Sequence, residues 1–310
     1  MKSNLFNYLS VLLLAVFAAT GCKKEGTEKL TADAEVATHY DDESLVSEET
    51  DAIADELNSL IEADPVLGGD ASVLDEVICD ATVSANFESD PMTVTVTFNG
   101  ATCNSKRTRS GVVVISMANG QHWKNAGAQI TVSYQDLKIT RKSDGKSITL
   151  NGYHKFTNQS GGLLHKLATT PSIIHTIFSD NLSIKFDDGD ARQWNVSRKR
   201  VYTYQEGIVL TVHGMHEDGS EQNIADWGVN RFGNSFITQI NTPVVVKQSC
   251  NFRITGGEIS HKTDEFQATA TFGLDVSGNP TGCPGDSKYY YRLGWKRQSN
   301  GNSFSLLLPY

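Results

Sequence analysis

The sequence of 310 residues has few prolines and few cysteines, and these shortages exclude several classes of protein. Seven prolines, and 26 glycines without a triplet period, exclude a collagen-like or proline-rich chain. A mean hydropathy of −0.31 excludes a polytopic membrane protein. A hydrophobic content of 39% excludes a wholly disordered chain and is enough for a substantial core.

The motifs of several enzyme classes are absent as well. The sequence contains no G-x-S-x-G nucleophile elbow, no G-x-x-x-x-G-K-[ST] phosphate loop, no G-x-G-x-x-G and no H-E-x-x-H. The usual sequence arguments for a serine hydrolase, a nucleotide-binding enzyme or a zinc protease are therefore missing. We predict no catalytic residue and no cofactor.

The amino terminus has the pattern of a lipoprotein signal peptide. Lys2 precedes an apolar run over residues 12–19, which is too short to span a bilayer comfortably. Small residues then lead directly to Cys22, as in the lipobox of bacterial lipoproteins. This resemblance implies cleavage after Gly21 and acylation of Cys22 by fatty acids such as palmitate, and several acyl chains give a stable anchor. An ordinary signal peptide with a chance cysteine is the alternative.

The same signal predicts where the protein is located. Lys23 stands where an aspartate would resemble an inner-membrane retention signal, so we expect the outer membrane. Whether the chain faces the periplasm or the cell surface stays open, as does its oligomeric state. The membrane is the expected partner through Cys22, and export argues against a nucleic-acid partner.

Charge is segregated along the chain. Residues 23–76 contain 17 acidic and three basic residues, a net charge of −14, whereas residues 77–310 carry a net +4. Residues 22–46 have few large apolar groups and no clear period, which predicts a flexible acidic tether.

A short helix is expected within residues 47–76. Ile53, Leu57, Leu60 and Ile61 fall on one helical stripe, which would pack on the β-body. Ser47 is the expected N-cap, with acidic residues in the first turn, and Asp64-Pro65 is the expected stop.

From residue 77 onward the dominant period is two, which predicts strands. Residues 79–87 and 92–98 form a hairpin in which Phe87 lies opposite Met92. Further alternating runs separated by turn signals follow, from residues 111–117 to residues 266–272. The fold class is therefore all-β, an extended antiparallel meander or sandwich over residues 77–310, with two lobes at about 77–165 and 166–310 as one arrangement.

Four cysteines follow Cys22 in a chain expected to be exported to an oxidising compartment, so disulfides are favoured over a zinc site. Three pairings are open, and the hairpin register favours Cys79–Cys103 together with Cys250–Cys283. The sequence lacks the C-x-x-C spacing typical of structural zinc.

Two groups of residues are candidates for binding. His213, His216 and Glu217 have side chains that could bind a divalent metal, although 213 and 216 fall on opposite faces of a strand, and polar residues at a strand end are the simpler interpretation. The second group combines bases and aromatics, which suit a glycan or an envelope polyanion. It consists of Arg198, Arg200, Tyr202, Tyr204 and Trp295. Aromatics facing inward and bases facing solvent are the alternative.

Two blocks, Val94–Gly100 leading to Cys103 and Arg107–Ile115, and then Thr242–Ile254, occur in a distinctive order. In this order they resemble an uncharacterised family of Bacteroidota outer-membrane lipoproteins. The resemblance implies an all-β architecture and outer-membrane anchoring, and it implies no activity. Family members carry an aspartate after the last cysteine, whereas Pro284 follows Cys283 here.

These observations favour a membrane-tethered β-protein with a non-catalytic binding, structural or adhesive role. An envelope hydrolase acting on glycan, with two facing carboxylates, is one alternative. A lipid or lipopolysaccharide carrier with an apolar trough is another.

Overall fold

A computed structural model describes residues 24–63, 66–67, 78, 80–100, 107–187, 189, 191–283, 288–298 and 301–310. Its contacts divide the chain into two units, residues 1–41 and residues 42–310. The predictions for the signal peptide, Gly21, Cys22, Cys79 and Cys103 lie outside the described residues. Among the helices described, none is both long enough and apolar enough to cross a membrane.

One long helix replaces the predicted tether and short helix. Helix α2 spans Lys24–Ala63, so the predicted boundary between residues 46 and 47 is wrong. Ser47 followed by acidic residues has the pattern of a helix N-terminus, which led to the wrong boundary. Ser47 in fact lies inside α2. The predicted stop is confirmed, because α2 ends directly before Asp64-Pro65.

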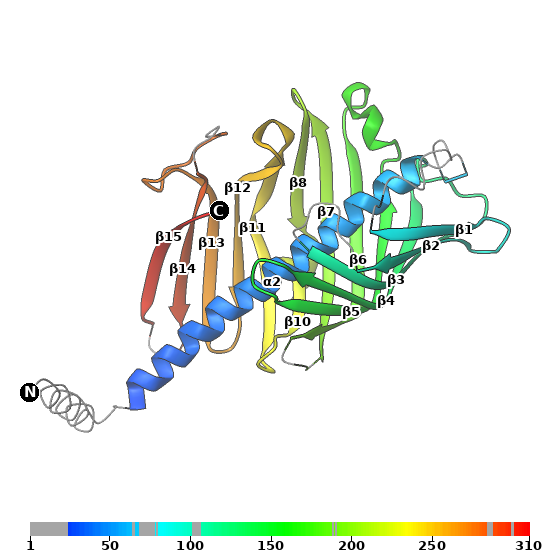
Figure 1. Cartoon of the computed structure of the whole chain (residues 1–310). Coiled ribbons are helices and arrows are strands. Elements are labelled where there is room, and N and C mark those ends of the chain that lie inside the picture. The colour runs from blue at the N-terminus through cyan, green and yellow to red at the C-terminus, as the bar shows by residue number, and fades with distance from the viewer. Residues whose placement is uncertain are drawn as a thin grey trace, which may run out of the picture. The chain divides into compact units, whose positions relative to one another are not determined.

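The strands of the described residues form one antiparallel sheet, which confirms the all-β class (Figure 1). Its strands are β1 (Ala81–Asn86), β2 (Met92–Asn99), β3 (Arg107–Met117), β4 (Ala128–Arg141), β5 (Ser147–Asn158), β6 (Ile173–Phe186), β7 (Ala191–Tyr204), β8 (Ile208–Gly214), β9 (His216–Asp218), β10 (Glu221–Val229), β11 (Ser235–Lys247), β12 (Arg253–Lys262), β13 (Phe266–Leu274), β14 (Tyr290–Arg297) and β15 (Ser303–Pro309). Short 3-10 helices lie at Leu164–Thr169 (η2) and Gln248–Cys250 (η3).

The sheet continues without a break across residue 165. Consecutive strands pair from β1 to β7, and again from β10 to β15. Residues 42–310 form one compact unit, so the arrangement in two lobes is wrong. The hairpin register is confirmed, because Ala81 pairs with Phe98 and Asn86 with Thr93, as a turn placing Phe87 opposite Met92 requires.

Two strands share one position in the sheet, between β7 and β11. β8 pairs with one end of β7 and β10 with the other, and both also pair with β11. After β8 the chain forms the short strand β9, which pairs with β10. β10 then passes beside Gly214, the last residue of β8. A Cβ at Gly214 would lie 1.9 Å from the carbonyl oxygen of Asn223, so only glycine allows this close approach.

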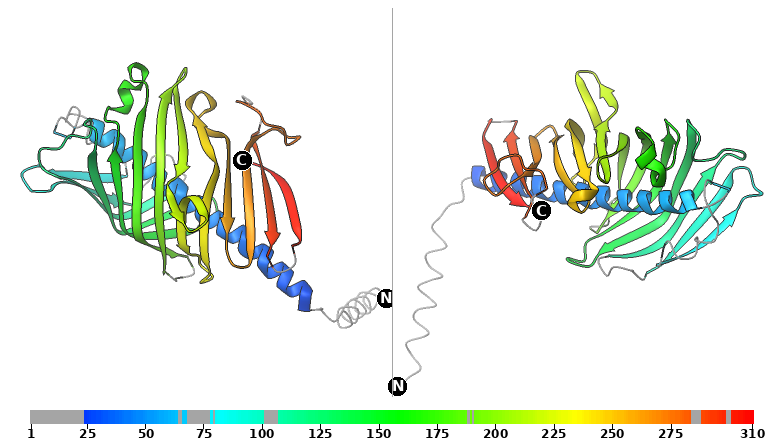
Figure 2. Two further views of the ribbon diagram at one scale, coloured as in Figure 1. Left: turned by 180° about the vertical axis from the view of Figure 1, so that it is seen from behind. Right: turned by 90° about the horizontal axis from the view of Figure 1, so that it is seen from above.

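We call the face of the sheet on which residues 42–63 of α2 pack the inner face, and the opposite face the outer face (Figure 2). Strand alternation sends the large apolar side chains to the inner face, as on β2, where Met92, Val94, Val96 and Phe98 are buried. Leu57, Leu60 and Ile61 of α2 join the same core. Each fully buried side chain of this size contributes roughly 1.5–3 kcal/mol.

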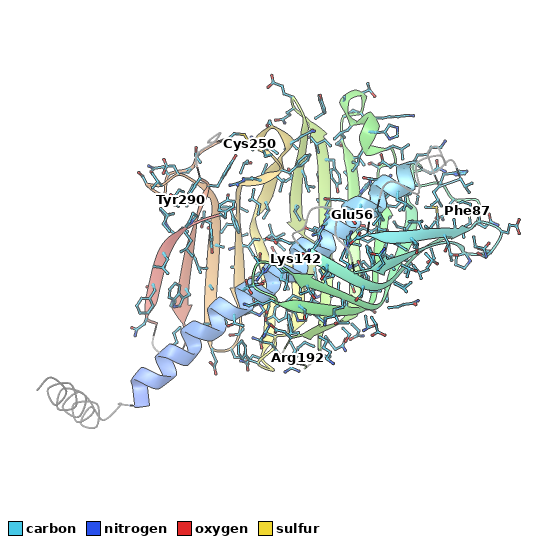
Figure 3. All side chains as sticks on the ribbon, viewed as in Figure 1. Glu56, Phe87, Lys142, Arg192, Cys250 and Tyr290 are labelled. Carbon is cyan, nitrogen blue, oxygen red and sulfur yellow. A yellow bond between two sulfur atoms is a disulfide. The ribbon has the colours of Figure 1, made fainter. Side chains whose placement is uncertain are left out.

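The sequence prediction of a disulfide between Cys250 and Cys283 agrees with the structure. The two Cα atoms are 5.3 Å apart, and Cys250 lies just after β11 (Figure 3). In the chain-entropy account a cross-link over 33 residues stabilises the fold by about 3–4 kcal/mol.

Candidate functional site

Five arginines on the α2 side of the sheet form ion pairs with acidic residues of α2 or with acids of neighbouring loops and strands. We call this set of contacts the helix seam. Its members are Arg107, Arg109, Arg198 and Arg200 of the sheet, Arg231 of the turn after β10, Asp42, Glu49, Asp51, Asp55 and Glu56 of α2, and Asp80, Asp187 and Asp226. Five acidic residues of α2 are thus paired with arginines of the β-body.

Arg109 is buried within the helix seam. Its Nε and Nη2 donate to both oxygens of Asp80, at 2.8 and 2.6 Å, and its Nη1 lies 2.6 Å from Glu56 on α2. The carboxylate of Asp80 is 1% exposed. Such a bidentate pair fixes the guanidinium in both position and orientation.

The two arginines predicted to bind a ligand belong to the helix seam instead. Arg198 donates to Asp226 and, over 3.0 Å, to the hydroxyl of Ser47. Arg200 pairs with Asp51 and lies 3.4 Å from Asp55. The alternative in which these two bases face solvent is wrong, because both arginines are directed to the inner face. Alternation along β7 could have shown that 198 and 200 share a face.

The other predicted ligand-binding residues are not gathered with them. Tyr202 is buried and contacts His175, whereas Tyr204 is 51% exposed at the end of β7. Trp295 lies on β14 and stacks with Phe304 at 5.5 Å between ring centroids. Five strand positions separate β14 from β7, which is roughly 24 Å along the sheet. The structure therefore divides this candidate site into separate places.

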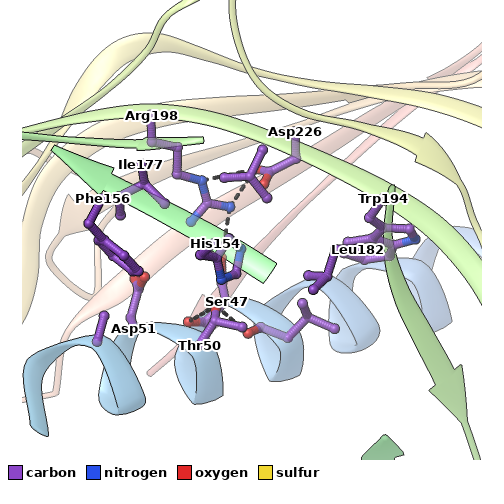
Figure 4. Close-up of a pocket in the computed structure, with 13 residues that line it drawn as sticks. Ser47, Thr50, Asp51, His154, Phe156, Ile177, Leu182, Trp194, Arg198 and Asp226 are labelled. Atoms are coloured by element: carbon purple, nitrogen blue, oxygen red, sulfur yellow. Dashed lines mark hydrogen bonds and ion pairs between the residues drawn. The ribbon is translucent and has the colours of Figure 1, made fainter. Parts of the chain in front are cut away.

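Two small cavities lie between α2 and the inner face. The first is bounded by Ser47, Thr50 and Asp51 of α2 and by His154 and Arg198 of the sheet, among others (Figure 4). The second lies beside His175. Each has a volume of about 20 Å³, which suits about one water molecule and not a sugar or an acyl chain.

Burial sets the charge of the histidines around these cavities. It lowers the pKa of His154 to about 3, with the charges of Arg198 and Arg200 acting in the same direction. It lowers the pKa of His175 to about 3 as well, again assisted by Arg200. The Nδ1 of His154 lies 2.8 Å from the hydroxyl of Tyr134. Both imidazoles are neutral at pH 7.

Burial acts in the opposite direction on Asp226, which lines the first cavity. It raises the pKa of this carboxyl group to about 6, although Arg198 favours the ionised form. Asp51 lines the same cavity, so two carboxyl groups do meet there. Each is held by an arginine, and the cavity leaves no room for a substrate between them.

The three candidate metal ligands, for which the sequence favoured an interpretation without a metal, do not form a cluster. His213 on β8 pairs with Lys199 on the neighbouring strand, and the ring of His216 stacks on Trp227 at 4.0 Å between centroids. Within the part of the chain that the structure describes, His213, His216 and Glu217 are not a group whose ligand atoms lie within 4.8 Å of one another.

The outer face carries a binding candidate that the sequence analysis missed. Phe178 on β6 is 44% exposed although it lies in the middle of the sheet. Lys155 on β5 and Ser197 on β7 are its direct cross-strand neighbours. Thr176, two residues before Phe178 on β6, lies between Thr157 of β5 and Lys199 of β7. We call these six residues the Phe178 patch.

The Phe178 patch could have been found by applying strand alternation to single residues. Lys199 stands between Arg198 and Arg200, so it must point to the opposite face. Phe178 was missed because the strand from residue 173 to 181 was not predicted. It carries apolar residues on both faces, which hides its period.

Comparison with family models, with curated proteins and with solved structures gave no match to this chain.

Proposed function

We propose that this chain is a lipid-anchored protein of the cell envelope, held at the outer membrane through acylated Cys22, whose β-body has a non-catalytic binding or structural role. The resemblance of its sequence blocks to Bacteroidota lipoproteins agrees with this assignment. The body would be held at the membrane and would present its sheet to large envelope molecules.

The observation that carries the proposal is the occupation of the inner face by the chain's own helix. Residues 42–63 of α2 cover the apolar inner face, and the arginines beside them are paired with acids. The two cavities described above suit about one water each. The outer face is therefore the broad surface on which a large ligand could lie.

The two alternative functions make different demands on the inner face. A glycan hydrolase needs carboxyl groups about 5–10 Å apart with a sugar between them, whereas Asp51 and Asp226 are each held by an arginine. A lipid carrier needs an open apolar trough, which α2 would have to leave. On the inner face, both alternatives thus require the helix seam to open.

Membrane fractionation of the full chain tests the anchor. We expect wild type to incorporate labelled palmitate and to fractionate with the outer membrane, and Cys22→Ser to lose the label and become soluble. An unlabelled wild-type chain would contradict the anchor.

Recovery of bound envelope polysaccharide tests the role. The detergent-purified full chain is incubated with isolated envelope polysaccharide, and the polymer length is measured before and after. Retention of polymer with its length unchanged is the expected result. Progressive shortening would establish the hydrolase alternative, and co-purification of stoichiometric lipid would establish the carrier.

A further inference from the structure

We infer that the Phe178 patch is a binding site for an acidic polysaccharide, in which Phe178 stacks on a sugar ring and Lys155 and Lys199 pair with carboxylate groups of the polymer. This inference deepens the proposed function and rests on it. It moves the binding site from the paired arginines of the inner face to the open outer face.

The aromatic ring is the first argument. A phenylalanine that is 44% exposed in the middle of a long sheet loses the stabilisation that burial would give it. Other rings in this part of the sheet, such as Phe156 and Trp194, face the inner side and are buried. An exposed ring on a flat face offers the apolar surface on which the C–H face of a pyranose can lie.

The charge around the ring is the second argument. Lys155 lies directly opposite Phe178, and Lys199 lies opposite Thr176, so cations stand on both neighbouring strands. Direct cross-strand neighbours have Cβ atoms about 5 Å apart and diagonal ones about 7–8 Å. Both ammonium groups are thus within reach of the acidic groups of a polymer stacked on the ring.

The acidic side chains nearby do not reverse this charge. Over β4 to β7 the outer face carries four lysines and two aspartates, namely Lys138, Lys155, Lys185, Lys199, Asp136 and Asp180. Asp180 accepts a hydrogen bond from Tyr153, and Asp136 accepts one from Asn151. The surface is therefore complementary to an anionic ligand, with the Phe178 patch at its aromatic centre.

The remaining neighbours favour a carbohydrate over other polyanions. Thr157, Thr176 and Ser197 complete the Phe178 patch, and their hydroxyls can both donate to and accept from sugar hydroxyls. A single-stranded nucleic acid would be bound better by several aromatic rings in a row. Phe178 is the one ring among the six residues of the patch, and the nearby Tyr153 donates its hydroxyl to Asp180.

Direct binding to polygalacturonate tests the inference. The detergent-purified full chain is titrated with this polyuronate, with neutral dextran and with oligothymidylate, at low and at physiological ionic strength. We expect binding to polygalacturonate above both other polymers. Phe178→Ala should weaken binding to polygalacturonate roughly tenfold at either ionic strength. The double substitution Lys155→Ala with Lys199→Ala should also weaken this binding, and it should make the affinity depend less on salt.

Matched controls on the same molecule separate a site from general attraction. Phe232→Ala removes another exposed phenylalanine, 47% exposed in the turn after β10. The double substitution Lys138→Ala with Lys185→Ala removes two positive charges from the outer face, as many as the double substitution in the patch. These two lysines lie opposite Thr149, one on each neighbouring strand. We expect each control to change the affinity for polygalacturonate less than twofold.

Three results would overturn the inference. The first is an affinity for oligothymidylate equal to that for polygalacturonate. The second is that the control variants weaken binding to polygalacturonate as much as the patch variants do. The third is binding that Phe178→Ala leaves unchanged. In each of these cases the proposed function stands if Cys22 is acylated and polymer length is preserved. Shortening of the polymer by the wild-type chain would instead contradict the proposed function.

Discussion

Along β7, Arg198 and Arg200 are directed to the inner face and contact α2, whereas Lys199 between them is directed to the outer face. The arginines are largely buried and ion-paired with carboxylates. Lys199 stands beside Thr176 and His213, with no carboxylate opposite it in the register. Three consecutive bases in the sequence therefore belong to two different surfaces.

The difference between the faces separates what holds the fold from what is available to a ligand. Inner-face charges are costly to bury and are tolerated because each has a partner placed by another element. Outer-face charges have no such requirement, since water solvates them. Substitutions on the inner face should thus act on stability, and those on the outer face on binding.

The largest effect should come from acidification. The pKa values of His154 and His175 are about 3 in the folded chain and 6.5 without burial. Below pH 6.5 the unfolded chain therefore binds protons that the folded chain refuses, and stability falls until pH 3. Each imidazole contributes on the order of 5 kcal/mol to this loss.

Asp226 opposes part of that loss. Its pKa is raised to about 6 from 3.8, so the folded chain binds this proton more tightly, and the carboxyl group adds stability as the pH falls from 6 to 4. Urea unfolding at several pH values should still show a net decrease from pH 6.5 to pH 3, and the decrease should be smaller in His175→Phe. A stability that does not change over this range would contradict neutral buried imidazoles.

Loss of Arg109 should have the next largest effect. Arg109→Ala leaves the carboxylate of Asp80 buried without its bidentate partner, which costs about 3–5 kcal/mol of unfolding free energy. Lys155→Ala, on the outer face, should change that free energy by less than about 0.5 kcal/mol. Equal effects of the two substitutions, measured by denaturant unfolding, would remove the distinction between the faces.

Truncation of an apolar side chain should show the same contrast. Leu57→Ala creates a cavity between α2 and the inner face and should cost about 2–4 kcal/mol. Phe178→Ala should cost less than about 1 kcal/mol, because the ring is already half-exposed. A stability loss in Phe178→Ala as large as that in Leu57→Ala would mean that Phe178 is held by packing and is unavailable for a ligand.

The sequence predicted strands such as β2 and β4 because an inner face of apolar residues and an outer face of polar residues produce a clean period of two. The hairpin register followed from residues 79–98 alone, since the turn length and the alternation leave one solution. The single sheet could not be distinguished from a sandwich. That choice depends on what covers the apolar face, and here α2 covers it.

The extent and role of α2 were predictable only in part. Ile53, Leu57 and Leu60 revealed its stripe, but Glu49 and Asp51 were interpreted as first-turn acids. Their true partners, Arg107 and Arg200, are more than 50 residues away in sequence. Local rules assign such charges to the nearest helix end, because the long-range ion pair leaves no local signature.

Hydroxyl-radical footprinting of the full chain, with and without polygalacturonate, tests the central claim most directly. We predict that the polymer protects Phe178 and Tyr153 on the outer face and leaves the modification of Tyr134 and Trp194 on the inner face unchanged. Increased modification of Tyr134 and Trp194, with Phe178 unaffected, would mean that the ligand displaces α2 and binds the inner face, and it would contradict the account.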